Sequence, residues 1–284
     1  MKILVLGASG MLGNAMMRVM AETGEYDVRG TARSASALRH FAPALAKRIL
    51  TNVDVEHIDA LSGVFQELRP DLVVNCIGLI KQLAAVDDPL QALPINSLLP
   101  HRLARLCSLI GARLVHVSTD CVFNGARGNY RESDSADAED LYGRSKLLGE
   151  VAYPNAITLR TSIIGHELSG AHGLVEWFLA QEKSVKGYRQ AVFSGLPTVE
   201  LSRIVRDVVL PRPALSGLFH VAAAPINKYE LLKLVATAYN KQIEIEPDDR
   251  VVIDRSLNAD YFREATGYVA APWPELISRM RDFQ

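Results

Sequence analysis

The sequence predicts an α/β fold with a doubly wound parallel sheet, the Rossmann arrangement, and a smaller C-terminal lobe. Two observations carry this prediction. Short apolar runs alternate with helical patterns over the first 165 residues, and glycines stand at the first strand-to-helix turn. The chain has 284 residues, 49% of them hydrophobic, which is enough for one large domain with a smaller lobe. We expect the sheet domain over 1–165 and the lobe over 166–284, with segments of about 190–225 returning to the sheet.

The predicted elements follow one another in the order typical of a parallel sheet covered by helices on both faces. Strands are expected over Ile3–Leu6, Tyr26–Thr31, Ile49–Val55, Leu72–Cys76, Arg113–Ser118, Ala156–Arg160 and Gly217–Val221. Helices are expected over Met11–Thr23, Ile58–Leu68, Ile95–Ile110, Gly170–Ala180 and Lys228–Tyr239, with one more around Lys146. The polar stretch Asn124–Asp140 is the longest predicted loop, placed where an active-site loop would lie.

Charge and cysteine content limit the classes of function. The 31 basic and 32 acidic residues give a net charge of −1, so electrostatics predicts no nucleic-acid or membrane partner. Cys76, Cys107 and Cys121 lack CxxC spacing, which favours a reduced, cytoplasmic protein. The histidines form no HxxxH or HExxH pair, so no metal site is expected. No apolar run approaches the ~20 residues of a spanning helix, and Met1–Leu6 is too short for a signal peptide.

Three glycines follow the first predicted strand with the spacing GxxGxxG. The first glycine allows a tight turn, the second lets the backbone approach a pyrophosphate, and the third lets the helix pack on the strand. The helix N-terminus then supplies N–H donors and the positive end of its dipole. We therefore expect a dinucleotide to bind at Gly7, Ser9, Gly10, Met11, Leu12 and Gly13. The alternative is a glycine-rich turn with only a structural role.

The end of the second predicted strand indicates which dinucleotide is preferred. An acid at this point would bind a ribose 2′-OH, but the sequence here is Gly30-Thr31-Ala32-Arg33-Ser34. Arg33 suits a 2′-phosphate instead, so we predict NADP(H), with NAD(H) as the alternative. Asp54 and Val55, after the third strand, are predicted to meet the adenine, although Asp54 equally suits a helix cap.

Tyr142 and Lys146 lie four residues apart on one predicted helix, so their side chains share a face. A free phenol has a pKa near ~10, and a neighbouring ammonium favours the phenolate and lowers that value. An acid whose pKa is closer to the working pH transfers protons faster. Lys146 can also bind the nicotinamide ribose. Because YxxxK is common by chance, this hypothesis depends on the helix following the fifth strand.

Hydroxyl groups end the fifth predicted strand. Ser118 and Thr119 stand at the carboxyl end of that strand, where open α/β sheets bind their ligands. Either could hold a substrate carbonyl oxygen beside Tyr142, and the alternative is that they cap a turn. His116 lies mid-strand between apolar residues and is expected to be a hydrogen-bonded core histidine.

Together these residues resemble the extended short-chain dehydrogenase/reductase superfamily, and most of all its dTDP-4-dehydrorhamnose reductase branch. The resemblance rests on Gly10–Gly13, on the STD-x-VF-x-G segment Ser118–Gly125, and on the YG-x-SK-x-x-GE segment Tyr142–Glu150. Arg160-Thr161-Ser162 and Gly217-Leu218-Phe219-His220-Val221 follow in the family's order. The resemblance covers nearly the whole chain.

The resemblance implies a function for several positions. Thr119, Tyr142 and Lys146 would be the catalytic triad of an NADPH-dependent reductase acting on a 4-keto sugar. Asn75, Cys76 and Gly78 would line the cofactor, with Ser118, and Asn96 matches an asparagine often near the site. The implied substrate contacts are Ser118, Asp120, Val122 and Arg255. It makes 1–165 the NADP-binding domain and 166–284 the mainly substrate-binding lobe, and a homodimer is compatible with it.

Three departures from the family concern the substrate. Ile163-Ile164 replaces an aromatic, Cys121 stands where tyrosine is common, and Asp254–Asn258 departs from the usual late segment. The chemistry is therefore predicted more firmly than the sugar or its nucleotide. Two alternatives stay open: an epimerase or dehydratase with bound NAD(P), where Asp120 would be the extra acid of a dehydratase, and a non-catalytic NADP-binding regulatory subunit. The lead hypothesis is a reductase of a nucleotide-activated 4-keto-6-deoxy sugar for cell-surface polysaccharide synthesis.

Overall fold

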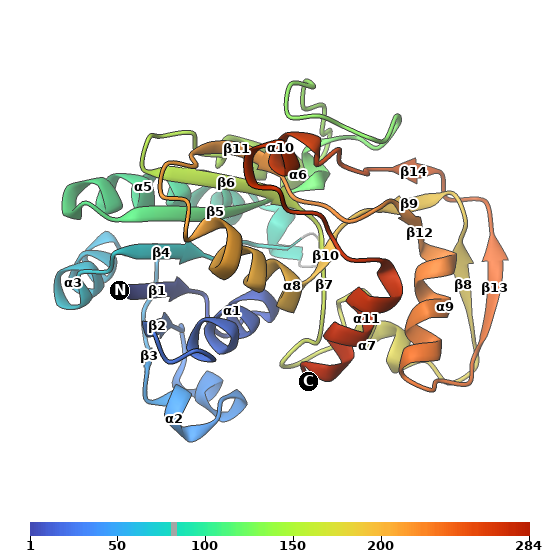
Figure 1. The fold of residues 1–284 in the computed structure, drawn as a ribbon, viewed down its shortest axis with the longest axis horizontal. Coiled ribbons are helices and arrows are strands. Elements are labelled where there is room, and N and C mark those ends of the chain that lie inside the picture. The colour runs from blue at the N-terminus through green and yellow to red at the C-terminus, as the bar shows by residue number, and fades with distance from the viewer. Residues whose placement is uncertain (81–83) are drawn as a thin grey trace. The chain divides into compact units, whose positions relative to one another are not determined.

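The computed structural model describes residues 1–80 and 84–284, and its main element is a seven-stranded sheet (Figure 1). The strand order is β11-β6-β5-β4-β1-β2-β3. Pairings of β1 with β2 and β4, of β4 with β5, and of β2 with β3 are parallel. The strands are β1 (Lys2–Leu6), β2 (Asp27–Thr31), β3 (Ile49–Leu50), β4 (Leu72–Asn75), β5 (Arg113–Thr119), β6 (Ala156–Thr161) and β11 (Gly217–His220). This confirms the predicted fold class.

Smaller sheets are built from the later part of the chain. They pair β10 with β7, β12 and β14 with β9, and β13 with β8. Their strands are β7 (Ile163–Ile164), β8 (Ser184–Tyr188), β9 (Ala191–Phe193), β10 (Leu196–Pro197), β12 (Ile226–Asn227), β13 (Glu244–Asp248) and β14 (Ile253–Asp254).

The helices of the described residues are α1 (Met11–Ala21), α2 (Pro43–Ala46), α3 (Ile58–Leu68), α4 (Pro89–Ala92), α5 (Leu99–Ile110), α6 (Leu141–Leu148), α7 (Leu174–Leu179), α8 (Thr198–Arg203), α9 (Lys228–Ala238), α10 (Asp260–Thr266) and α11 (Trp273–Asp282). A π-helical segment, Leu93–Leu98, runs directly into α5. No helix in the described part of the chain is long and apolar enough to cross a membrane.

The chain divides into two compact units. The sheet unit comprises Met1–Ser118, Glu139–Leu159 and Ser202–Leu218, and the second unit comprises Thr119–Ala138, Arg160–Leu201 and Phe219–Gln284. Residues 202–218 thus return to the sheet unit, where the Arg206 guanidinium donates to the Val19 carbonyl at 2.9 Å. The boundary at 165 was predicted to separate NADP-binding residues from mainly substrate-binding ones. This assignment of roles stays a prediction.

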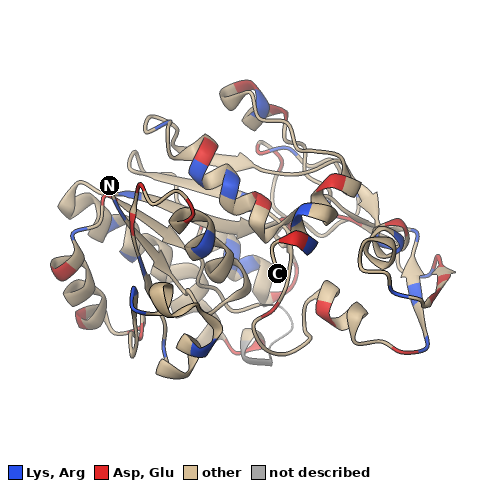
Figure 2. Cartoon of the chain, turned by 60° about the horizontal axis from the view of Figure 1, so that its bottom comes forward, with Lys and Arg blue, Asp and Glu red and all other residues tan. Residues whose placement is uncertain are grey.

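The core of the sheet unit lies between the central strands and the helices α3 and α5. It joins strand residues such as Leu4, Val73 and Leu114 to Leu61 of α3 and Leu103 of α5, all essentially inaccessible to solvent. Alternate residues of a strand face opposite sides, so this apolar layer fixes which side each polar strand residue faces. The buried methionines of α1 fill space on the sheet as well. Acidic and basic residues are interspersed along the ribbon (Figure 2).

Two predicted elements are shorter than expected by five residues each. The third strand was expected to reach Val55 but ends at Leu50, because Asn52 adopts a left-handed conformation with φ of 61° and turns the chain. The helix expected from Gly170 begins only at Leu174. Gly170 has a φ of 90°, and the Glu167 carboxylate accepts the N–H groups of the two residues before the helix.

Candidate functional site

The glycine turn joins β1 to α1 in the geometry that a phosphate site needs. Gly7 has a φ of 78°, which favours glycine, and its carbonyl accepts the Gly10 N–H at 3.0 Å. A Cβ at Gly13 would lie 2.0 Å from the Gly7 oxygen, so only glycine lets α1 approach the strand this closely. Ser9 and Gly10 are exposed, and the first turn of α1 carries no acid. This end of α1 therefore fits a dinucleotide's phosphates.

The residues predicted to select the dinucleotide lie beyond β2 and β3. Arg33 is exposed and follows the buried Ala32. The Asp54 carboxylate accepts the Glu56 N–H at 3.0 Å and lies 3.7 Å from the His57 ring. Asp54 thus shapes the turn before α3, while the Val55 side chain is buried. The contacts of Arg33 with a 2′-phosphate and of Asp54 and Val55 with adenine stay predictions.

Helix α6 carries Tyr142 and Lys146, and Asp140 determines where it begins. The Asp140 carboxylate caps the helix by accepting the Gly143 N–H at 2.7 Å. Lys146 is 5% exposed, and its ammonium donates to the Val117 carbonyl of β5 at 2.9 Å. Desolvation lowers the pKa of Lys146 to about 8, partly opposed by the Glu150 carboxylate. Tyr142 is half-buried one turn earlier.

Asn96 connects α6 to the segment that follows β4. It lies in the π-helical segment, a feature frequent at functional sites. Its side-chain oxygen accepts the Leu79 N–H at 2.9 Å, and its amide donates to the Ser145 hydroxyl at 3.1 Å. The approach is close, since a Cβ at Gly149 would lie 1.9 Å from the Asn96 carbonyl oxygen. Asn96 and Gly149 thus hold α6 in place.

The residues predicted to line the cofactor after β4 lie beside this group. A Cβ at Gly78 would be 3.4 Å from the Asn96 side-chain oxygen and 3.6 Å from the Lys146 ammonium, so glycine keeps the backbone near both. The Asn75 side-chain oxygen accepts the Ile77 N–H at 3.1 Å. Burial raises the pKa of the Cys76 thiol to about 12, so it stays protonated at neutral pH. The structure thus brings Asn75, Cys76, Gly78 and Lys146 together within the sheet unit.

Ser118 is bound by a residue that the sequence analysis did not single out. Its hydroxyl donates to the Glu150 carboxylate at 2.7 Å, and its side chain is buried. Glu150 is the last residue of the YG-x-SK-x-x-GE segment, so the motif contained the signal. The contacts of Ser118 with cofactor and substrate stay predictions. They require the Ser118 hydroxyl to accept a further hydrogen bond while it donates to Glu150.

Thr119 and Asp120 form a tight turn at the start of the second unit. The Thr119 hydroxyl accepts the Cys121 N–H and donates to the Asp120 carboxylate, both at 3.1 Å. Asp120 is 8% exposed, and burial raises its pKa against the opposing effects of Thr119, Arg255, Cys121 and Lys228. Lys228 is the first residue of α9. Its proximity to Asp120 was not predicted, since nothing in the sequence relates it to the STD segment.

The two other predicted substrate contacts help to hold the chain after this turn. The Arg255 guanidinium donates from Nε to the Phe123 carbonyl at 2.7 Å. The Val122 side chain is fully buried, and its carbonyl accepts the N–H groups of Asp137 and Ala138. The contacts of both residues with substrate stay predictions. Because the Val122 side chain is fully buried, its predicted contact concerns the backbone.

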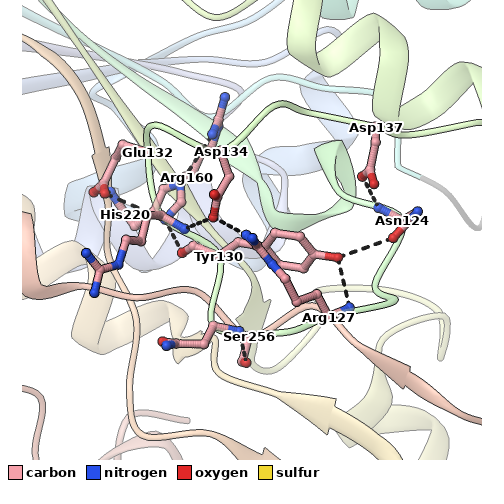
Figure 3. Close-up of polar contacts among 11 residues, drawn as sticks. Asn124, Arg127, Tyr130, Glu132, Asp134, Asp137, Arg160, His220 and Ser256 are labelled. Carbon is pink, nitrogen blue, oxygen red and sulfur yellow. Dashed lines mark hydrogen bonds and ion pairs between the residues drawn. The ribbon is translucent and has the colours of Figure 1, made fainter.

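A network within the second unit orders the predicted loop (Figure 3). The Tyr130 ring stacks on Phe123 with the centroids 4.1 Å apart and the planes 6° from parallel. The His220 N–H donates to the Glu132 carboxylate at 2.7 Å, and the His220 ring bonds the Tyr130 carbonyl at 3.0 Å. Burial lowers the pKa of His220 to about 4, with the Arg160 charge acting in the same direction. Phe123 and His220, which are both buried, thus hold the loop in place.

No group of three or more histidine, cysteine or acidic residues in the described ranges could hold a metal ion. A protein-family model for the RmlD substrate binding domain matches residues 1–254. The chain belongs to the RmlD substrate binding domain family. Family membership confirms the resemblance drawn from the motifs.

Relatives in this family differ in what their names say. The dTDP-4-dehydrorhamnose reductase of Mycobacterium tuberculosis is 32% identical over 170 residues, which are 57% of this chain and 49% of that protein. The match therefore spans about half the length of that relative. The beta subunit of methionine adenosyltransferase 2 from Danio rerio is 27% identical over 254 residues, covering 84% of this chain and 74% of that one.

A solved structure shows the same fold. The dTDP-4-dehydrorhamnose reductase of Bacillus anthracis, in complex with NADP, matches with a TM-score of 0.81 at 23% identity. The match covers 100% of this chain and 98% of that chain. The chain thus shares the fold of a structure that was solved with NADP bound.

Proposed function

We propose that this protein is an NADPH-dependent reductase of the C4 ketone of a nucleotide-activated 4-keto-6-deoxy sugar, used in cell-surface polysaccharide synthesis. The observation that carries the proposal is the Tyr142–Lys146 pair on α6, with the Lys146 ammonium held at the carboxyl end of β5. The glycine turn before α1 supports it, because its geometry fits a dinucleotide. Membership of the RmlD substrate binding domain family supports it as well.

The residues of this chain would manage the proton. Tyr142 would donate a proton to the C4 oxygen of the sugar while bound NADPH would supply the hydride for the C4 carbon, so that the ketone would become an alcohol. Lys146 favours the phenolate that this transfer leaves, because its ammonium is close and poorly solvated. Solvent then returns the proton to Tyr142. Thr119 is proposed as the third catalytic residue, and in the structure its hydroxyl donates to the Asp120 carboxylate.

Two groups of residues would hold the cofactor. The glycine turn and the N-terminus of α1 would bind the pyrophosphate, and Arg33 would bind the 2′-phosphate that distinguishes NADP(H) from NAD(H). Gly78 would leave the backbone free to approach the nicotinamide side, since it already lies against Asn96 and Lys146.

Two other functions have support from particular observations. The buried Asp120 beside Thr119 is the acid that a dehydratase on this fold would use, with NAD(P) staying bound. The similarity to the beta subunit of methionine adenosyltransferase 2 supports a regulatory subunit that binds NADP without turnover. The Tyr142–Lys146 pair favours the reductase over that subunit.

One assay distinguishes the three functions. Purified protein is incubated with NADPH and a panel of dTDP- and UDP-linked 4-keto-6-deoxy sugars, while absorbance reports NADPH and chromatography reports the sugars. The proposal predicts one NADPH oxidised for each sugar reduced. Sugar conversion without net oxidation would show an epimerase or dehydratase. NADPH binding without conversion of any sugar would show a binding subunit.

A further inference from the structure

His116 is a buried histidine for which the proposed reaction has no use. It lies in β5, is fully inaccessible to solvent, and pairs in register with Asn75 of β4. Its Nδ1 is 3.1 Å from the Asn75 side-chain amide. Among the described residues its Nε2 has no hydrogen-bond partner, so the sequence-based expectation of a fully bonded core histidine is met only on one side.

The hydrogen bonds determine the tautomer. The Asn75 side-chain oxygen accepts the Ile77 N–H at 3.1 Å, which leaves the amide nitrogen, a donor, facing His116. Nδ1 must then be the acceptor, and the neutral ring carries its proton on Nε2. Burial, together with the charge of Lys146, lowers the pKa of His116 well below its usual range. The ring is thus neutral at physiological pH.

This arrangement has a cost that packing alone does not explain. A buried donor without a partner costs about 1–3 kcal/mol, and the Nε2–H of His116 carries that cost in β5. What the histidine supplies is an acceptor for Asn75. Asn75 in turn holds the backbone at Ile77, the start of the segment predicted to line the cofactor.

That segment lies between two predicted cofactor contacts. On one side, a Cβ at Gly7 would lie 2.8 Å from the Ile77 side chain and 3.4 Å from its backbone nitrogen. On the other side, a Cβ at Gly78 would lie 3.6 Å from the Lys146 ammonium. A shift of the backbone at Ile77 would therefore change the distance of this segment from the glycine turn and its distance from Lys146.

We propose that His116 is a positioning residue for the cofactor: its neutral ring, protonated on Nε2, orients Asn75 and so sets residues 77 and 78 between the glycine turn and Lys146. The inference rests on the proposed function, in which this segment faces NADP(H). It assigns His116 no contact with substrate or cofactor.

Two substitutions separate the acceptor from the volume of the ring. His116→Leu keeps an apolar side chain of similar size and removes the acceptor. His116→Asn places its side-chain oxygen where Nδ1 stands and keeps the acceptor. NADPH affinity is measured by calorimetric titration of the purified wild type and both variants, with melting temperature recorded for each.

His116→Leu exchanges the unpaired ring N–H for an unpaired Asn75 N–H, so it should weaken NADPH binding about tenfold while its melting temperature stays close to that of the wild type, the loss in affinity corresponding to one hydrogen bond. His116→Asn should bind within about twofold of the wild type. Equal NADPH affinity of His116→Leu and the wild type would overturn the inference and leave the proposed function standing. Absence of NADPH binding by the wild type would overturn both.

A spectroscopic measurement tests the same point if the leucine variant does not fold. Long-range proton–nitrogen spectra of the wild type labelled with ¹⁵N-histidine report which ring nitrogen carries the proton. The proposal predicts a neutral His116 ring protonated on Nε2 from about pH 6 to 8, a signal that Asn75→Asp perturbs. A ring protonated on Nδ1, or on both nitrogens, would contradict it.

Discussion

The two units hold their polar residues in different ways. In the sheet unit, Lys146 bonds to β5, Asn96 bonds to α6, and Ser118 bonds to the second residue beyond α6. In the second unit, the loop after β5 is held by partners far along the chain, such as His220 at 88 residues from Glu132 and Ser256 at 127 residues from Asn129. Regular elements thus position the proposed chemistry, whereas tertiary contacts position the residues proposed to recognise the sugar.

The difference predicts which substitutions affect binding of the sugar and which affect the proposed proton transfer. A change in the loop network of the second unit alters the surroundings of Val122 and Arg255, two predicted substrate contacts, and leaves α6 and the glycine turn as they are. A change in α6 would instead alter the proton transfer for every sugar. Substitutions at the predicted substrate contacts of the second unit should therefore change sugar binding. Substitutions in the sheet unit should change turnover or cofactor binding.

The largest expected change in stability concerns the loop network. Tyr130→Ala removes a buried ring that stacks on Phe123, and it should lower the free energy of unfolding by about 3–5 kcal/mol. Tyr130→Phe keeps the ring and loses the hydroxyl's bonds with Asn124 and the Arg127 N–H, which costs about 1 kcal/mol. Denaturant titration measures both values. Equal losses for the two variants would show that stacking does not hold the loop.

Lys146 should make the opposite contribution, because its burial serves binding at the expense of stability. Its pKa falls from 10.5 to about 8, so folding releases a proton between those values and stability rises with pH across that window. At pH 7 the wild type carries the full penalty, about 3 kcal/mol. Lys146→Met should be more stable by about 2–3 kcal/mol at that pH.

The same variant should lose turnover and NADPH affinity, and its advantage in stability over the wild type should shrink as the pH rises from about 8 to 10.5. Thermal melts across this range measure the slope. A methionine variant that is less stable than the wild type at pH 7, or that keeps the wild-type slope, would contradict this account of Lys146.

Arg33 tests the predicted cofactor preference of the sheet unit. A charge-assisted bond to a 2′-phosphate is worth roughly 1.5–3 kcal/mol. Arg33→Ala should therefore weaken NADPH binding by about 10- to 150-fold and leave NADH binding almost unchanged. Arg102→Ala, which removes an exposed arginine from α5, is the matched control. Equal losses for NADPH and NADH would exclude Arg33 as the discriminating residue.

Arg255 tests substrate binding by the second unit and should have the smallest effect. Its guanidinium is predicted to contact the sugar's diphosphate, and its Nε already bonds the Phe123 carbonyl. Arg255→Ala should raise KM for the nucleotide sugar about tenfold without changing NADPH affinity. Arg255→Lys keeps the charge and should recover part of the loss. An unchanged KM across the sugar panel would remove this assignment.

The sequence predicted the sheet unit better than the second unit for a physical reason. The glycine turn and α6 rest on local signals, namely close approach at Gly13 and the spacing of Tyr142 and Lys146 on one face of a helix. Lys228 lies more than a hundred residues beyond the STD segment, and no local pattern relates the two. The bond between Ser118 and Glu150 was within reach, because both belong to motifs that the sequence displays.

The most direct test of the central claim is the single-turnover rate of Tyr142→Phe with NADPH and the sugar that the wild type reduces. The substitution removes one oxygen and keeps the ring, so α6 and the contacts of Lys146 should persist. If Tyr142 donates the proton, the rate should fall by about 10²–10⁴ while the Kd for NADPH stays within about twofold of the wild-type value. A rate within about tenfold of the wild type, at unchanged NADPH affinity, would show that the proton comes from another group.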